Sequence, residues 1–221
     1  MSDRELASLH QRWSAYEELP NLTEHWYWRP GWRADRQFYT WHLTFEHQLE
    51  LHALVARIQA ELALPELDLV PVDGLHLTMQ GIGFADEINY ADIEEIIAAI
   101  RLLCASMPPL ELTLGPVDPD AEGIGLLVQP WAQVERLRNT IREAIDTVWR
   151  SVPEPADGFR PHVTIAYSGS PAPAGPIRRR LAALRDLPPA RVRIGHVPLI
   201  ALRRADRTYR WTTVAEANLA G

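Results

Sequence analysis

The sequence contains no lysine. All 22 of its basic residues are arginine. Any reaction that needs a lysine nucleophile, a lysine Schiff base or the phosphate-binding lysine of a P-loop is therefore excluded. Nucleotidyl transfer through a lysyl-adenylate is excluded for the same reason.

Cysteine and long apolar runs are equally scarce. Cys104 is the only cysteine, so a disulfide framework and a zinc site built from thiolates are excluded. No run of about 18 apolar residues is present, and the N-terminal stretch is polar, with acidic residues such as Asp3 and Glu5. We therefore expect neither a membrane span nor a secretory leader, and we expect a cytoplasmic protein.

Positive charge is also in deficit. The net charge is -7 and the pI is near 5.6, which argues against a protein that coats long nucleic acid through a broad basic surface. A small anionic substrate in a local pocket is compatible with this balance. The chain has 221 residues, of which 47% are hydrophobic, enough for one domain or two closely packed lobes.

Hydrophobic periodicity predicts a mixed succession of helices and strands. Apolar residues recur at three- and four-residue steps in the helical segments, whereas alternation and β-branched or aromatic residues mark the strands. We expect helices over residues 5–17, 51–64, 89–104, 130–150 and 177–185, and strands over 38–45, 75–82, 110–115, 123–129, 159–167, 191–203 and 208–214. This order lacks regular βαβ alternation, so we favour an α+β fold.

Two of the expected strands contain the same short pattern of histidine, one apolar residue and threonine. The first is GLHLTMQGIG, with His76 and Thr78, and the second is FRPHVTIAYSG, with His162 and Thr164. Both strands alternate strictly, so each histidine shares a polar face with its threonine about 6.6 Å away. Each strand is followed by a loop and a helix, which indicates a diverged duplication whose two lobes meet near these strands.

Side by side, the two strands would line one groove with two imidazoles and two hydroxyls. Histidine has an unperturbed pKa near 6.5, so such a pair can supply one neutral base and one protonated acid near neutral pH. The base can take a proton from water or a ribose hydroxyl while the acid protonates the departing oxygen. The threonines can donate hydrogen bonds to phosphoryl oxygens. This chemistry needs neither a metal nor a cofactor, and we expect none.

A His-x-Thr tripeptide alone carries little information, and the chain has a third copy, His42-Leu43-Thr44. Two roles are open for His42: a buried, hydrogen-bonded side chain, which we favour, or a substrate contact in the groove. The pair at His76 and His162 differs from the third copy because it occupies corresponding places in the two halves of the apparent repeat.

The two units LHLTMQGIG and FRPHVTIAY resemble the paired signatures of the two-histidine (2H) phosphoesterase superfamily, which includes 2′-5′ RNA ligase-like proteins and cyclic nucleotide phosphodiesterases. The resemblance covers roughly residues 38–214. It implies a bilobal, pseudo-symmetric α+β fold in which two antiparallel sheets, flanked by helices, enclose a central cleft. It implies metal-independent action on 2′,3′-cyclic phosphates or 2′-5′ linkages of a small nucleotide or RNA end. His76 and His162 then correspond to the catalytic pair, and Thr78 and Thr164 to the phosphate ligands.

Residues 1–37 match nothing in that family pattern, and we treat them as an N-terminal extension rich in tryptophan and arginine, ahead of a two-lobed domain over 38–221. The stretch HWYWRPGWRADRQFYTW interleaves aromatic rings with arginines, as a groove for a nucleobase and phosphate would. Packing of these tryptophans onto the domain is the alternative that we favour. Further candidate substrate contacts are Trp28, Phe84, Arg160 and Tyr167.

Three functions fit these observations. They are a metal-independent cyclic phosphodiesterase, an ATP-independent 2′-5′ RNA ligase and a non-catalytic nucleotide- or RNA-binding module. The presence of both histidines and both threonines argues against the module, and the acidic pI favours small nucleotides or short RNA ends over long RNA. The sequence indicates no obligate protein partner.

Overall fold

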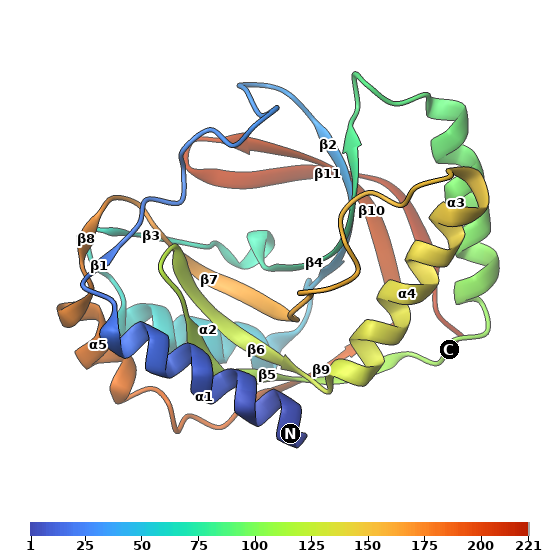
Figure 1. Cartoon of the computed structure of the whole chain (residues 1–221). Helices are drawn as coiled ribbons and strands as arrows, with labels where there is room; N and C mark the ends of the chain where they lie inside the picture. The colour runs from blue at the N-terminus through green and yellow to red at the C-terminus, as the bar shows by residue number, and fades with distance from the viewer. Residues whose placement is uncertain (221) are drawn as a thin grey trace.

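The computed structural model describes residues 1–220 and has two large antiparallel sheets, each covered by helices (Figure 1). The four-stranded sheet has the strand order β11-β10-β2-β4. Its strands are β2 (Phe38–Thr44), β4 (His76–Phe84), β10 (His196–Ala205) and β11 (Thr208–Asn218).

The second sheet is five-stranded, with the order β3-β7-β6-β5-β9. Its strands are β3 (Leu67–Leu69), β5 (Leu110–Pro119), β6 (Gly123–Gln129), β7 (His162–Ser168) and β9 (Ala190–Ile194). The two strands that carry the His-x-Thr units, β4 and β7, contact each other between the two sheets. The bilobal α+β fold predicted from the sequence is therefore confirmed.

Five helices cover the sheets: α1 (Asp3–Glu18), α2 (Leu49–Glu61), α3 (Tyr90–Cys104), α4 (Trp131–Val148) and α5 (Ala174–Ala182). Their apolar stripes face inward as the periodicity predicts, and in α3 the buried residues include Ile93, Ile96 and Ile100. Asn89 caps α3 by accepting a hydrogen bond from the backbone N–H of Ala91 at 3.1 Å. None of the helices within residues 1–220 is long and apolar enough to cross a membrane.

The chain repeats one succession of elements. In both halves a strand, a helix, a His-x-Thr strand and a helix occur in the same order, as β2-α2-β4-α3 and as β6-α4-β7-α5, with the short β3 inserted before β4 and the short β8 after β7. Each His-x-Thr strand pairs antiparallel with the strand that precedes the helix, β4 with β2 and β7 with β6. The helices between the paired strands reach the other sheet, because α2 packs on β7 and β9 and α4 packs on β4 as well as on β6 of its own sheet.

The expectation of one strand over residues 191–203 is wrong. The chain leaves the five-stranded sheet after β9 and enters the four-stranded sheet at β10, with Gly195 between them. Apolar alternation continues on both sides of Gly195, so periodicity gives no sign that the chain changes sheets. A small third sheet, in which β1 (Asn21–Leu22) pairs with β8 (Ala172–Pro173), also has no periodic signal because its strands are so short.

The N-terminal residues pack closely on the rest of the chain. Helix α1 lies on β5 and buries Leu9, Trp13 and Tyr16 in the core. The segment over residues 23–37, here called the strap, then crosses from one sheet to the other. The backbone N–H of His25 donates to the Ser168 carbonyl in β7 at 2.9 Å. At the other end, Arg36 Nε donates to Asp86 Oδ1, just after β4, at 2.8 Å.

Candidate functional site

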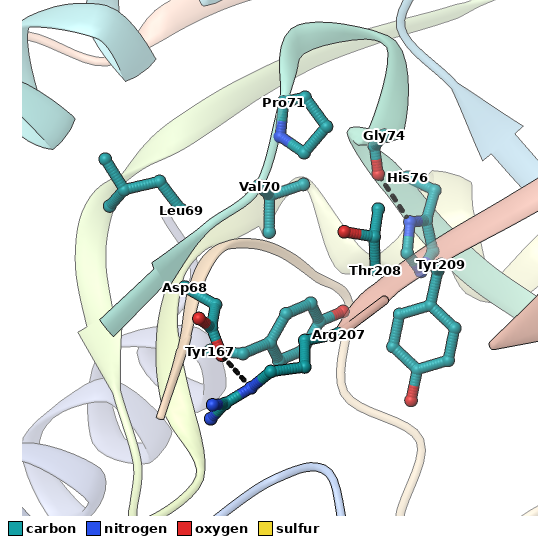
Figure 2. A pocket seen from close by; sticks show the side chains of 10 residues that line it. All are labelled: Asp68, Leu69, Val70, Pro71, Gly74, His76, Tyr167, Arg207, Thr208 and Tyr209. Carbon is teal, nitrogen blue, oxygen red and sulfur yellow. Dashed lines mark hydrogen bonds and ion pairs between the residues drawn. The ribbon is translucent and has the colours of Figure 1, made fainter. Parts of the chain in front are cut away.

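His76 is the first residue of β4, and a short 3-10 turn, Val72–Gly74, precedes it. Its Nδ1 lies 2.8 Å from the carbonyl oxygen of Gly74 (Figure 2). A carbonyl oxygen can only accept, so Nδ1 carries the proton and Nε2 is left free. Burial of this half-buried ring lowers the pKa of His76 to about 4, although the Gly74 hydrogen bond acts in the opposite direction. His76 is therefore neutral at neutral pH.

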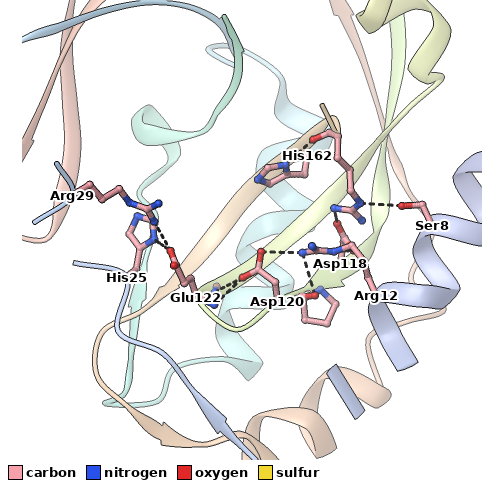
Figure 3. Close-up of polar contacts among 11 residues, drawn as sticks. Ser8, Arg12, His25, Arg29, Asp118, Asp120, Glu122 and His162 are labelled. Atoms are coloured by element: carbon pink, nitrogen blue, oxygen red, sulfur yellow. Dashed lines mark hydrogen bonds and ion pairs between the residues drawn. The ribbon is translucent and has the colours of Figure 1, made fainter. Parts of the chain in front are cut away.

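His162 is held in the same way in the other lobe. Its Nδ1 lies 2.9 Å from the carbonyl oxygen of Arg160, which is also two residues earlier in the chain (Figure 3). Nδ1 again carries a proton, which leaves Nε2 available for proton transfer. Unlike His76, His162 is exposed to solvent.

Both histidines and both threonines line one cavity of about 370 Å³. Thr78 and Thr164 lie on the same strand faces as His76 and His162, as alternation requires. The four residues singled out in the sequence are thus brought together in space. Two imidazoles and two hydroxyls around one volume can accept a proton, donate a proton and bind an anion.

Of the other candidate residues, Tyr167 and His42 also line this cavity, whereas Trp28, Phe84 and Arg160 do not. Phe84 packs beneath the guanidinium of Arg36, whose Cζ is 3.6 Å from the ring centroid. Arg160 forms an ion pair with Asp118, and its Nε donates to Ser8 Oγ in α1 at 3.3 Å. Trp28 is 55% exposed on the strap.

His42 is fully buried in β2 and contacts two residues of β4. Its Nε2 lies 3.2 Å from Thr78 Oγ1. Its ring stacks on that of His76, with centroids 4.6 Å apart and planes 3° from parallel. Burial lowers the pKa of His42 well below its usual value, and nearby His76 lowers it further. The hydrogen-bonded role favoured from the sequence is present, and His42 also faces the cavity.

His25 of the strap also lines the cavity. The sequence did not predict this position. His25 Nδ1 lies 3.1 Å from Glu122 Oε2 (Figure 3), and its Nε2 lies 2.9 Å from the hydroxyl of Tyr209. Its ring stacks on Tyr167 with centroids 4.0 Å apart. Burial lowers the pKa of His25 to about 4, so a neutral ring donates to Glu122 and accepts from Tyr209.

An aromatic end completes the cavity. Trp32 of the strap and Phe38 of β2 line it together with Leu202, and the two rings lie 5.7 Å apart between centroids. Trp32 and Phe38 belong to the aromatic and arginine-rich stretch noticed in the sequence, which therefore both packs on the domain and contributes to the cavity. Other lining residues carried no sequence signal, among them Glu154, Arg204 and Tyr209.

No group of three or more His, Cys, Asp or Glu side chains within residues 1–220 is arranged to hold a metal ion.

The sequence matches a family model, and the fold is similar to solved structures of other proteins. The model of the 2′-5′ RNA ligase superfamily matches residues 45–206. Among solved structures, TT0787 of Thermus thermophilus is similar with a TM-score of 0.62 and 19% identity, over 84% of this chain and 98% of that one. No curated protein sequence gives a significant match.

Two further solved structures have the same fold. E. coli LigT complexed with 3′-AMP is similar with a TM-score of 0.62 and 19% identity, over 85% of this chain and 100% of LigT. ATU0111 from Agrobacterium tumefaciens is similar with a TM-score of 0.53 and 15% identity, over 89% of this chain and 86% of that protein.

Proposed function

Because this chain belongs to the 2′-5′ RNA ligase superfamily, we propose that it is a metal-independent phosphodiesterase that opens 2′,3′-cyclic phosphates by two-histidine acid and base catalysis. One observation carries the proposal. His76 and His162 each hold Nδ1 on a carbonyl oxygen two residues earlier, and they line one cavity with Thr78 and Thr164.

The environments of the two histidines divide the roles between them. His76 is neutral at neutral pH because burial lowers its pKa to about 4, so its Nε2 accepts a proton from the attacking water. The water oxygen bonds to phosphorus as one bond between phosphorus and a ribose oxygen breaks. His162 Nε2–H gives its proton to that departing oxygen. The product is a ribose phosphate monoester with one free hydroxyl, and the histidines exchange roles in the reverse direction.

Thr78 and Thr164 are the proposed donors to the non-bridging phosphoryl oxygens. Their hydroxyls lie beside the two imidazoles in the same cavity. Negative charge grows on these oxygens in the transition state, so hydrogen bonds from fixed donors stabilise the transition state more than the substrate.

The proposed substrate is a single nucleotide or the end of a short RNA. A cavity of about 370 Å³ lies at the small end of the range of about 300 to 1,000 Å³ typical of ligand sites. Trp32 and Phe38 offer ring faces on which a nucleobase can stack. The related fold of E. coli LigT has been solved complexed with 3′-AMP and with ATP, which supports a nucleotide ligand here.

The test is turnover of the four nucleoside 2′,3′-cyclic phosphates by the purified protein in the presence of EDTA, with products identified by ³¹P NMR. We expect a phosphate monoester to form, and we expect EDTA to have no effect. Binding without turnover, measured by calorimetry, would favour the non-catalytic module. Joining of an RNA that ends in a cyclic phosphate to an RNA with a free hydroxyl would favour ligation, in which a ribose hydroxyl replaces water.

A further inference from the structure

The third His-x-Thr copy lies directly against the first. Strands β2 and β4 are antiparallel, and their register places His42 opposite Thr78 and Thr44 opposite His76. Residues that face each other across an antiparallel pair project from the same face of the sheet. The third copy therefore brings an imidazole to the hydroxyl of the first copy, and His42 Nε2 lies 3.2 Å from Thr78 Oγ1.

The second lobe has no counterpart to this imidazole. There the residue opposite Thr164 is Gly125 in β6. A Cβ added at Gly125 would lie 3.6 Å from Cδ2 of His162. No side chain therefore stands beside His162 at the place that corresponds to His42 in the first lobe, so the His42 contact is not a by-product of the repeated fold.

The surroundings of His42 indicate which nitrogen carries its proton. The ring is fully buried and neutral, so it has one N–H and one lone pair. Its Nδ1 is buried without a hydrogen-bond partner among residues 1–220. Proteins seldom leave a buried N–H without an acceptor, whereas an unpartnered acceptor is tolerated more often. The proton therefore belongs on Nε2, where Thr78 Oγ1 accepts it.

We propose that His42 is a positioning residue of the phosphate site: its Nε2–H donates to Thr78 Oγ1, so that the Thr78 hydroxyl proton is left to be donated to a phosphoryl oxygen. This inference rests on the proposed function, in which Thr78 binds the phosphate. The opposite tautomer would turn the hydroxyl proton of Thr78 towards His42 and away from the substrate. Stacking on His76 at 4.6 Å also fixes the plane of the neighbouring ring.

The first experiment compares His42→Phe with His42→Gln on a nucleoside 2′,3′-cyclic phosphate. Phenylalanine keeps the stacked ring but lacks the donor, whereas the amide of glutamine restores an N–H near the Nε2 position. Removal of a whole oxyanion donor costs about 10²- to 10³-fold in kcat. Since Thr78 itself remains, we expect His42→Phe to lower kcat by roughly 10- to 100-fold with little change in KM, and we expect His42→Gln to recover most of it.

The matched control is His52→Phe. His52 on α2 also hydrogen-bonds through Nε2, to the Phe45 carbonyl at 2.7 Å, but it does not line the cavity. This variant should keep the wild-type kcat. Wild-type kcat in a folded His42→Phe protein would overturn the inference.

A double-mutant cycle with Thr78→Val separates positioning from a general structural role. If His42 acts through the Thr78 hydroxyl, adding His42→Phe to Thr78→Val should cost little more than Thr78→Val alone. Independent, multiplying losses would show that His42 acts by another route and would overturn the inference.

The tautomer itself can be measured on the wild-type protein without any assay of turnover. In ¹⁵N-labelled protein, long-range proton–nitrogen correlation NMR should show the His42 proton on Nε2. A proton on Nδ1 overturns the inference even if the enzyme is active. Absence of turnover in the wild type, by contrast, overturns the proposed function, and the two failures are thereby distinguished.

Discussion

The two lobes present the same pair of side chains to the cavity but surround them differently. In each, a histidine rests its Nδ1 on a carbonyl oxygen two residues earlier and a threonine follows on the same strand face. His76 is half-buried and stacked on a second imidazole, whereas His162 is exposed and has Gly125 on the neighbouring strand. Duplication thus accounts for the paired chemistry, and the residue on the neighbouring strand distinguishes one histidine from the other.

The largest effect should come from removing either histidine. We expect His76→Ala and His162→Ala each to lower kcat/KM by about 10²- to 10⁴-fold on a cyclic nucleotide. An aryl phosphodiester, whose leaving group needs no proton, sharpens the comparison. On this substrate His162→Ala should recover most of its activity, because the acid is dispensable, whereas His76→Ala should stay impaired. Equal recovery in both variants would contradict the division of roles.

The pH profile tests the same asymmetry. A base must be neutral to act, and burial lowers the pKa of His76 to about 4. We therefore expect no loss of kcat/KM as the pH falls from 7 to about 5, and then a drop of roughly tenfold per pH unit below about 4. Stopped assays across pH 3.5 to 7 would check this, with enzyme stability measured at each pH. An acidic limb near the ordinary histidine value of about 6.5 would contradict the role given to His76.

A smaller effect is expected at the aromatic end of the cavity, where Trp32 lies away from the two His-x-Thr units. Stacking of a base on an aromatic ring is worth about 1 to 3 kcal/mol, so Trp32→Ala should raise KM for a cyclic nucleotide by about 5- to 150-fold. Glycerol 1,2-cyclic phosphate has no base, and its kcat/KM should be unchanged by the substitution. Equal losses on both substrates would mean that Trp32 supports the cavity without contacting a base.

The smallest effect is expected at Gly125. An added Cβ would lie 3.2 Å from the Val163 carbonyl oxygen and 3.6 Å from the His162 ring, so Gly125→Ala should move the Val163 carbonyl, directly after His162 in β7, by a few tenths of an ångström. We expect a loss of roughly three- to tenfold in kcat, less than the hundredfold that a misplacement of about 1 Å can cost. A wild-type kcat in Gly125→Ala would show that the close packing of Gly125 against β7 does not affect catalysis.

Alternation in the sequence predicted much of the site. It placed His76 with Thr78 and His162 with Thr164 on polar faces, and β4 and β7 have these faces. It did not predict that His42 lies opposite Thr78. That register depends on two irregularities in the pairing of β2 with β4, where β4 has one extra residue opposite Tyr39–Thr40 and another opposite Trp41–His42. Each slip of one residue moves side chains to the other face of the sheet.

The strap shows a different limit of sequence reasoning. Residues 23–37 have no helical or strand period, so nothing in their pattern specified where they would lie. Their path is set by tertiary contacts, including the hydrogen bond from Arg204 to the Tyr27 carbonyl at 2.9 Å. His25 and Trp32 reach the cavity because of that path. The aromatic and arginine content of the strap marked it as a candidate, but composition alone does not distinguish a segment that packs on the domain from one that lines the cavity.

Because α2 and α4 each pack on strands that lie in the other sheet, neither half of the repeat can bury all of its apolar surface alone. Since α2 packs on β7 and β9 while α4 packs on β4, a chain divided between α3 and β5 would leave each fragment with an apolar face that only the other fragment can cover. The halves should therefore unfold in a single cooperative transition. Damage to the buried face of α2, which lies in the first half, would loosen the strand that positions His162 in the second.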